Sequence, residues 1–436
     1  MIVLRAPRMI DGIAAHPVED AEIQVDGTTL RYAGSRHRAP AVPPTARLIE
    51  LPDQTLLPGW IDAHVHPANL WDEPLSTGEI RSTRQPPVFR GRGPGAAESP
   101  DVREAIHATV ALRKLLLSGV TTARDLGSRG TVGMDLRAAA NDGVIPSPRL
   151  RSAGRVVCPT GGHMHRSGIE GDGVDGATRA ARQAFKDGAD FIKITASGGG
   201  GTIGTPMGRP TFGTPELRAI AHEAAQRGSY ATAHVHSTEA IVRCLEAGVL
   251  MLEHATFYDR DQQVRYDPEV GKRILDAGVV ISPTMAAFGR QLERIEAARD
   301  TLGPQQAEHW AWVADGFARR LEIVHHLHEL GCPLIIGSDA PACGTPYDDL
   351  AFGIQLHVRA GVPMMTAIRS ATSLSATAIG VDGVTGSLRA GLDADVIAVR
   401  GNPLTRPEAV SCTSFVMQLG QIVRHEPAPD LPEAGR

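Results

Sequence analysis

Short apolar runs alternate with amphipathic stretches through most of the chain. Many of the amphipathic stretches end in a glycine, after which an apolar run begins, as at Gly119 before VTTARD and Gly248 before VLMLEH. Glycine suits the left-handed backbone position that ends a helix. Thr214 and Asp267 each precede a proline, which is typical of the residue that caps the start of a helix. Together with the first run, LLPGWIDAHVH, and the run at 149–157, the pattern predicts eight strands alternating with helices, the order of a (β/α)8 TIM barrel.

The two ends of the chain have a different pattern. Residues 1–57 and residues 385–436 each contain short alternating strands that are broken by turns. Neither end has enough strands to bury a face by itself. We therefore predict a small β-sandwich domain built from both ends, beside a barrel domain of residues 58–384.

Polar residues stand where the apolar runs end, and one interrupts a run. Parallel strands that end one after another in such residues direct them toward one common site. Alternate residues of a strand share a face, so both histidines of HVH point the same way. The residue types are those that bind metals, and the pattern predicts a metal centre. The residues are His64, His66, Lys193, His234, His236, His254 and Asp339.

Composition and charge limit the classes of partner that we expect. With 436 residues, 42% hydrophobic and 21% charged, the chain is long enough for one large core and a smaller one. Its 44 basic and 49 acidic residues give a net charge of −5 without long runs of either sign, so we expect small-molecule substrates and neither nucleic acid nor membrane as partners. Five cysteines without a CxxC pair suit free thiols, and with no export signal recognisable we expect a cytoplasmic protein, which we also expect to be a homo-oligomer.

Two loops follow the ends of predicted strands. Residues 67–100 are rich in proline, glycine and arginine, and residues 197–213 are rich in glycine. In barrel enzymes this is the face that carries the site, so both loops are candidate pocket walls. The glycine run lacks the Lys-Ser/Thr of a phosphate-binding P-loop.

Five motifs in this order, LLPGWIDAHVH, DFIKI, TAHVHS, LEHAT and GSDAP, resemble the metal-dependent amidohydrolase superfamily. GVTTARDLGS, TGGHMH and GADFIKITASGG resemble the branch that contains imidazolonepropionase-like proteins, Xaa-Pro and Xaa-Arg dipeptidases and ochratoxin-type amidases. The resemblance implies two divalent metal ions, which we expect to be zinc.

The resemblance also implies a role for each ligand. His64 and His66 would bind the more buried ion, and His234 and His254 the more exposed one. Lys193 would bridge the two ions as a carbamate formed from carbon dioxide, because burial lowers the pKa of an amine and leaves it neutral. Asp339 would bind the first ion and move the proton of the bridging water to the leaving group. The alternative for Lys193 is a structural ion pair.

Other residues are candidate substrate contacts. In similar dipeptidases the first histidine of TGGHMH, here His163, is associated with the substrate carbonyl. His236 shares a face with His234, and we favour a contact to the carbonyl over a third metal ligand. His165 would contact substrate or support its loop. Arg209 is the only basic residue in 197–213 and is our candidate for binding a substrate carboxylate. The alternatives for that role are Arg90, Arg92 and Arg124, of which Arg124 is first expected to pair with Asp125.

We therefore expect a hydrolase that cleaves the amide bond of an N-acyl amino acid or of a dipeptide-like small molecule. Lactones, carbamates, ureas and organophosphates are competing substrates, because the same centre can attack them. A deaminase is disfavoured, since single-metal relatives of that kind generally lack the lysine that stands here at position 193. A catalytically silent scaffold is the alternative from another class.

Overall fold

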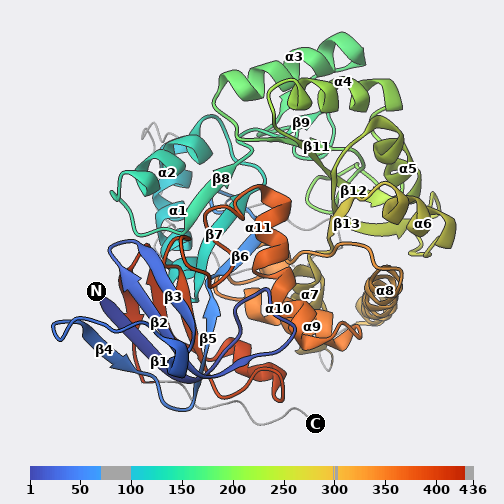
Figure 1. Cartoon of the computed structure of the whole chain (residues 1–436). Coiled ribbons are helices and arrows are strands. Elements are labelled where there is room, and N and C mark those ends of the chain that lie inside the picture. Colours follow the sequence, from blue (N-terminus) through green and yellow to red (C-terminus); the bar gives the residue numbers. More distant parts are fainter. Residues whose placement is uncertain (70–99, 298, 300–302, 428–436) are drawn as a thin grey trace, which may run out of the picture.

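The computed structural model describes residues 1–69, 100–297, 299 and 303–427 (Figure 1). The chain has an α/β fold with two parallel sheets and a third sheet formed by its ends. Residues 70–99, which make up most of the predicted loop 67–100 and include Arg90 and Arg92, lie outside the described residues.

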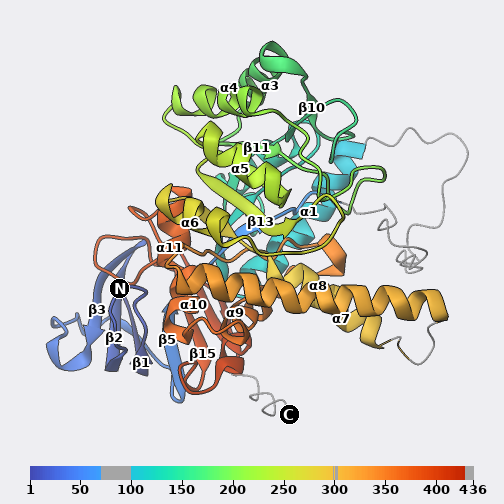
Figure 2. The same ribbon diagram turned by 90° about the vertical axis from the view of Figure 1, so that its right-hand side faces the viewer.

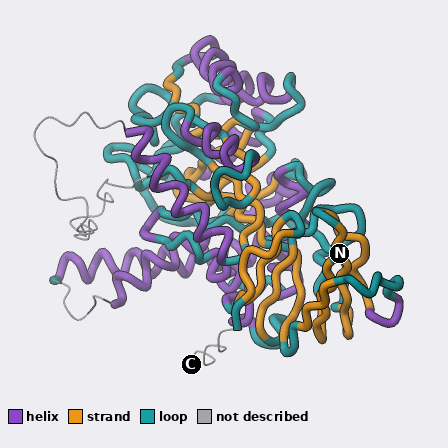
Figure 3. The backbone as a smooth tube through the Cα atoms, turned by 90° about the vertical axis from the view of Figure 1, so that its left-hand side faces the viewer, coloured by secondary structure: helices purple, strands orange, loops and turns teal. Residues whose placement is uncertain are grey.

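Strands from both ends of the chain pair in one sheet, the terminal sheet, in which blue and red strands lie side by side in Figure 1. Figure 3 shows the strands of this sheet in orange near the N-terminus. Its order is β17-β16-β15-β5-β1-β2-β3, and β4 also pairs with β1. The link between the two ends is the antiparallel pairing of β5 with β15. The division into two domains stays a prediction. The strands are β1 (Ile2–Met9), β2 (Val18–Asp26), β3 (Thr29–Ser35), β4 (Arg47–Glu50), β5 (Gln54–Pro58), β15 (Val396–Arg400), β16 (Thr413–Gln418) and β17 (Gln421–His425).

The remaining strands form two parallel sheets, in the orders β6-β7-β8 and β10-β9-β11-β12-β13-β14. Residues on both faces of most of these strands are buried, as expected of parallel strands that pack between other elements. The strands are β6 (Trp60–Val65), β7 (Val120–Asp125), β8 (Arg149–Ser152), β9 (Val157–Cys158), β10 (Ile169–Glu170), β11 (Ile192–Thr195), β12 (Ala231–Ser237), β13 (Met251–Tyr258) and β14 (Val280–Ser282).

Two predicted strands differ from the expectation. The run at 149–157 is divided between β8 and β9, which belong to different sheets, and Gly154 between them has a φ of 58°. The last run is not a regular strand, yet it hydrogen-bonds on both sides. Ile335 N donates to Ile281 O of β14 (2.9 Å), and Ala63 N of β6 donates to Ile336 O (3.0 Å). We call residues 333–339 the closing segment.

Helices cover the parallel strands on their outer side, with α3 to α6 over β9 to β13 (Figure 1). Figure 2 shows α8 as one long helix beside α7, extending away from the sheets. The helices are α1 (Pro100–Leu117), α2 (Val132–Asn141), α3 (Gly173–Lys186), α4 (Thr214–Ala225), α5 (Thr238–Ala247), α6 (Pro268–Asp276), α7 (Met285–Ala297), α8 (Pro304–Glu329), α9 (Leu350–Arg359), α10 (Met364–Ser370) and α11 (Ser373–Ile379), with 3-10 turns at Arg36–Arg38, Ala342–Gly344 and Pro407–Ser411.

The predicted helix ends are mostly confirmed. Gly248 ends α5 with a φ of 79°, and the Asp267 side chain caps α6 by accepting from the backbone of the first turn. The prediction for Thr214 was wrong by one residue. Gly213 is the cap of α4, and the Glu216 carboxylate accepts from its N–H (2.7 Å). The glutamate thereby satisfies the backbone donor of the cap residue, which is one half of a capping box.

Apolar side chains gather in two main clusters, a large one between the parallel sheets and their helices and a smaller one under the terminal sheet. In the part of the chain that the structure describes, no helix is both long and apolar enough to cross a membrane.

Candidate metal centre

The structure brings the predicted metal ligands together at one end of the parallel strands. His64 lies in β6, Lys193 in β11, His234 in β12 and His254 in β13. The exposed fraction is at most 8% for each of the seven polar residues that the sequence pattern indicated, which are His64, His66, Lys193, His234, His236, His254 and Asp339. All except His64 line one pocket of about 1110 Å³, counting the part that is open to solvent.

The ring nitrogens of two histidines converge on the carboxylate of Asp339. His64 Nδ1–H donates to Glu253 Oε2 (2.7 Å), and His66 Nδ1–H donates to the carbonyl of Gly127 (3.2 Å). Because a carboxylate and a carbonyl only accept, the Nε2 atom of a neutral ring in either position carries a lone pair. They lie 3.3 Å and 3.5 Å from Asp339 Oδ1, and Nε2 of His64 is buried without a hydrogen-bond partner. Three acceptors that meet without a hydrogen between them fit a bound cation.

Ionisation states favour the same conclusion. Burial lowers the pKa of His66 to about 3, so its ring is neutral. Burial alone would raise the pKa of Asp339, but His64, His66 and Lys193 outweigh it and lower that pKa below its usual value. Neutral imidazoles and an ionised carboxylate are the forms that bind metals.

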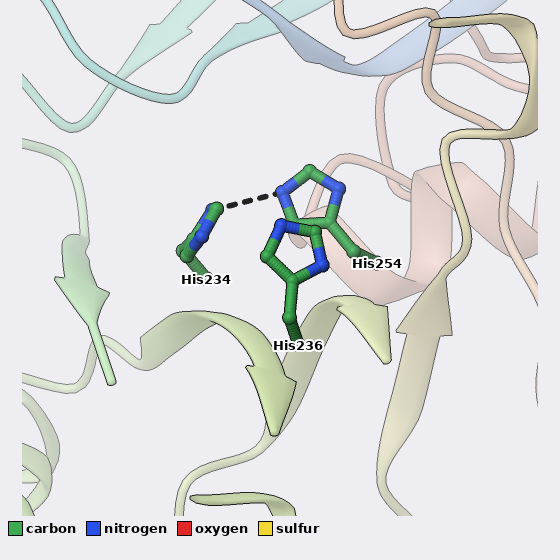
Figure 4. A group of neighbouring side chains, drawn as sticks. All are labelled: His234, His236 and His254. Carbon is green, nitrogen blue, oxygen red and sulfur yellow. Dashed lines mark hydrogen bonds between the residues drawn. The ribbon is translucent and has the colours of Figure 1, made fainter. Parts of the chain in front are cut away.

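A second group of histidines lies next to the first (Figure 4). His234 Nε2–H donates to the carbonyl of Gly198 (3.1 Å), which leaves its Nδ1 as an acceptor 3.0 Å from Nε2 of His254. His236 has Nδ1 2.8 Å from Thr256 Oγ1. One ligand atom from each of the three histidines lies within 4.8 Å of the others, and His254 belongs to a further such group with His64 and Asp339. The histidines therefore offer ligands for a cation here as well.

Lys193 is 1% exposed in β11. Burial lowers its pKa to about 8, although Glu253 and Asp339 act in the opposite direction. Among the described residues, no carboxylate lies within 4.0 Å of its amine. A structural ion pair, the alternative for this lysine, is therefore not what the described part of the chain contains.

Sequence reasoning missed Glu253 and misplaced Arg124. The Arg124 guanidinium is fully buried and pairs with Glu253 (2.7 Å), while Asp125 accepts from Ser152 Oγ (2.8 Å). The expected pair of Arg124 with Asp125 was wrong, because neighbours along a strand point to opposite faces. Burial would raise the pKa of Glu253, but Arg124 and His64 keep it well below its usual range. The available signal was an acidic residue inside the apolar run VLMLEH.

The backbone is strained at two of the candidate ligands. His254 has a φ of 70° and Asp339 a φ of 57°, and Thr284, which lies 2.7 Å from His254 Nδ1, has a φ of 50°. Left-handed conformations of residues other than glycine are uncommon and gather at functional sites.

The predicted substrate contacts are only partly brought to the pocket. His163 lines it, with its ring centroid 4.4 Å from that of His234, and burial lowers its pKa to about 4. His165 is not among the lining residues and faces Glu170 at 3.9 Å. Arg209 is exposed and also lies outside the lining, although its loop contributes Gly200, Gly201 and Met207 to the wall. Among the described residues, the arginine that lines the pocket is instead Arg320 of α8, which an amphipathic helix pattern does not distinguish from a surface arginine.

The chain is similar to several known proteins. Ochratoxinase from Aspergillus niger is 29% identical over 315 residues, which span 66% of this chain and 62% of the length of that relative. A crystal structure of a Xaa-Pro dipeptidase with bound methionine in the active site is 26% identical, with a TM-score of 0.77, and covers 97% of this chain and 99% of its own. The crystal structure of A. niger ochratoxinase, 23% identical with a TM-score of 0.77 over 97% of this chain and 96% of its own, shares the fold.

The model of the amidohydrolase family matches residues 55–423, from the strand that precedes His64 to the last strand of the terminal sheet. The resemblance found in the motifs is thereby confirmed, and the chain belongs to the amidohydrolase family.

Proposed function

We propose that this protein is a metal-dependent hydrolase that cleaves the amide bond of an N-acyl amino acid or of a dipeptide-like small molecule. The observation that carries the proposal is the convergence of the Nε2 lone pairs of His64 and His66 on the Asp339 carboxylate in a pocket. The names of the relatives, an ochratoxinase and a Xaa-Pro dipeptidase, favour an amide substrate.

The donor set suits two divalent ions, and we propose zinc, which prefers imidazole and carboxylate ligands in such sites. His64, His66 and Asp339 would hold one ion, and His234 and His254 the other. We propose that Lys193 carries a carbamate, because an amine with a pKa near 8 is partly neutral at physiological pH and can add carbon dioxide. When bound, the ions polarise a carbonyl and lower the pKa of water.

The residues of the chain would then act on the proton and on the carbonyl. Asp339, ionised because its pKa is lowered, accepts the proton of the attacking water and gives it to the leaving amine. His163 and His236, neutral in the pocket, each have an N–H to donate to the carbonyl oxygen as charge develops on it.

We also propose that the two parallel sheets and the closing segment form one (β/α)8 barrel. The support is that the closing segment hydrogen-bonds to both β14 and β6, while Asp190 N, just before β11, donates to Ser152 O of β8 (2.9 Å). Homo-oligomer formation stays a prediction that light scattering of the purified protein tests.

Metal analysis tests the centre directly. We expect two ions per chain after reconstitution with zinc and bicarbonate, and loss of one ion in His64→Ala. Lys193→Ala should bind metal poorly and recover in part with a short carboxylic acid, which replaces the carbamate. His325→Ala, which changes an exposed histidine on α8, is the control. At most one ion under saturating conditions would contradict the binuclear centre.

Activity assays test the substrate class. The metal-loaded protein is offered N-acyl amino acids, dipeptides, lactones, carbamates, ureas and organophosphates. We expect the highest kcat/KM for the amides. A clear preference for another class would overturn the amide proposal, and inactivity toward all of them with both ions bound would favour a silent scaffold.

A further inference from the structure

One wall of the pocket is apolar but contains a buried cation. Phe288 of α7, Tyr258 at the end of β13 and Val313 of α8 line this wall around Arg320, which is 7% exposed. The Arg320 guanidinium carbon lies 3.9 Å from the centroid of the Phe288 ring, and Nη2 donates to the Tyr258 hydroxyl oxygen (2.9 Å). The aromatic ring and the hydroxyl therefore fix the plane of the guanidinium.

This cation lacks a counterion among the residues that the structure describes. No described carboxylate lies within 4.0 Å of the Arg320 guanidinium, and its Nε is buried without a hydrogen-bond partner. Asp315, which also lines the pocket, pairs with Arg319 instead (2.7 Å). A buried charge without a partner is costly, whereas the same charge facing a bound anion is compensated.

The position of Arg320 relative to the histidines limits the anion. The Phe288 ring lies 6.3 Å from the ring of His236 and 6.4 Å from that of His254, measured between centroids. In an N-acyl amino acid, one carbon separates the scissile nitrogen from the carboxylate. If the amide bond lies at the histidines, the carboxylate of the leaving amino acid can therefore reach the wall beside Phe288.

We propose that Arg320 binds the carboxylate of the leaving amino acid, and that Phe288, Val313 and the apolar atoms of Tyr258 contact an apolar side chain of that amino acid. The guanidinium offers a two-point contact to a carboxylate, and the Tyr258 hydroxyl, which accepts from Arg320, keeps its own hydrogen to donate. This inference rests on the proposed amide hydrolysis and replaces Arg209, which is exposed, as the carboxylate anchor.

Kinetics with a matched pair of substrates test the anchor. N-acetyl-L-phenylalanine and N-acetyl-2-phenylethylamine have the same type of scissile bond and the same ring, but only the first has a carboxylate. We expect Arg320→Met to lower kcat/KM for the acid at least about 30-fold more than for the neutral analogue, mostly through KM, which is what loss of a desolvated charge pair predicts. Arg320→Lys should retain part of the preference, because it keeps the charge but not the planar fork.

Two control variants make the same arginine-to-methionine change at other positions. Arg319→Met removes the neighbouring arginine of α8, which is half exposed and paired with Asp315, and Arg209→Met removes the exposed loop arginine. Neither should alter the preference for the acid. Equal losses for acid and analogue in both Arg320 variants would mean that Arg320 only supports the wall and would overturn the inference.

Calorimetric binding separates the anchor from the proposed function. The wild-type protein should bind N-acetyl-L-phenylalanine more tightly than the neutral analogue, and Arg320→Met should remove that difference. If amides are not hydrolysed but this difference is found, the proposed function fails and the anchor stands. If amides are hydrolysed and the wild-type protein binds and cleaves both compounds equally, the anchor alone is wrong.

Discussion

Buried histidines in this protein differ in what their second ring nitrogen meets. In the metal centre, one nitrogen of His64 or His66 is fixed by an acceptor, and the other faces Asp339. His357 of α9 is 1% exposed, its Nδ1–H donates to the carbonyl of Gly353 (2.8 Å), and its Nε2 is buried without a partner. Protonation of Nε2 would place a charge in an apolar environment, so burial lowers the pKa of His357 to about 4.

This pKa predicts an acid sensitivity that His357→Leu removes. The unfolded state, with a histidine pKa near 6.5, takes up a proton as the pH falls below that value, whereas the native state does so only near pH 4. Protonation therefore favours unfolding in this window. When the pH is lowered from 7 to 5, the free energy of unfolding of the wild type should therefore fall by about 2 kcal/mol more than that of His357→Leu. Urea denaturation of both proteins at pH 7 and pH 5 measures these free energies. If the wild type and the variant differ by the same amount at both pH values, the lowered pKa of His357 is contradicted.

The sequence indicated these residues as candidate ligands because each is a polar residue in or at the end of an apolar run, where an unpaired polar group is costly. Glu253 stands in such a run too, but its role depends on Arg124 and His64, which are far away along the chain. Arg320 could not be found, because only the packing of α8 against α7 and β13 buries it.

At the scale of elements, the closing segment lies directly against β6. A Cβ added to Gly337 would be 2.3 Å from Cβ of His64 and 2.7 Å from its backbone nitrogen, so only glycine fits. Beyond it, Asp339 N donates to the carbonyl of His64 (2.7 Å). The two elements that carry ligands are thus positioned by backbone contact and not only by their side chains.

Gly337→Ala should therefore push the closing segment away from β6. We expect the free energy of unfolding to fall by about 1–3 kcal/mol, which is typical of overpacking, together with weaker metal binding. The control is Gly383→Ala, where an added Cβ has no neighbour within 4 Å. Thermal unfolding and metal titration of both variants give the answer, and equal behaviour of the two would show that the segment can move without cost.

The alternation of apolar runs and glycines was enough to predict most strands and helices. The spacing of apolar residues and the positions of glycines both depend on the local backbone conformation. It did not predict that Gly154 divides the run at 149–157 or that the closing segment is irregular. Both depend on which neighbouring strand supplies the hydrogen bonds, and that is decided by packing across the sheets.

At the scale of the whole molecule, Asp395 links the terminal sheet to the parallel sheets. Its side chain is fully buried and pairs with Arg149 of β8 (2.8 Å), and it accepts from Thr385 Oγ1 (2.8 Å) and from the backbone of Leu419 (2.9 Å). Its carbonyl accepts from the N–H of Gly59, the residue between β5 and β6 (3.0 Å). Asp395 thus contacts both the junction between β5 and β6 and the strand β8 of a parallel sheet.

Asp395→Ala should lower the free energy of unfolding by about 3–5 kcal/mol, because Arg149 and two other donors lose a buried acceptor. The control, Asp276→Ala, breaks an exposed pair with Lys272 and should change the free energy of unfolding far less. Chemical denaturation of both variants tests the prediction. A small effect of Asp395→Ala would mean that the terminal sheet is held to the parallel sheets by other contacts.

The pairing of β5 with β15 also sets an order of events during synthesis. Thr55 of β5 donates to the carbonyl of Gly401, 346 residues later. Ribosomes add about 5–20 residues per second, so β5 waits for tens of seconds before its partner strand exists. During that time the edge of β5 that pairs with β15 is unpaired, and unpaired strand edges favour aggregation. The candidate metal centre, whose first predicted ligand is His64, cannot be complete before Asp339 has been synthesised, 275 residues later.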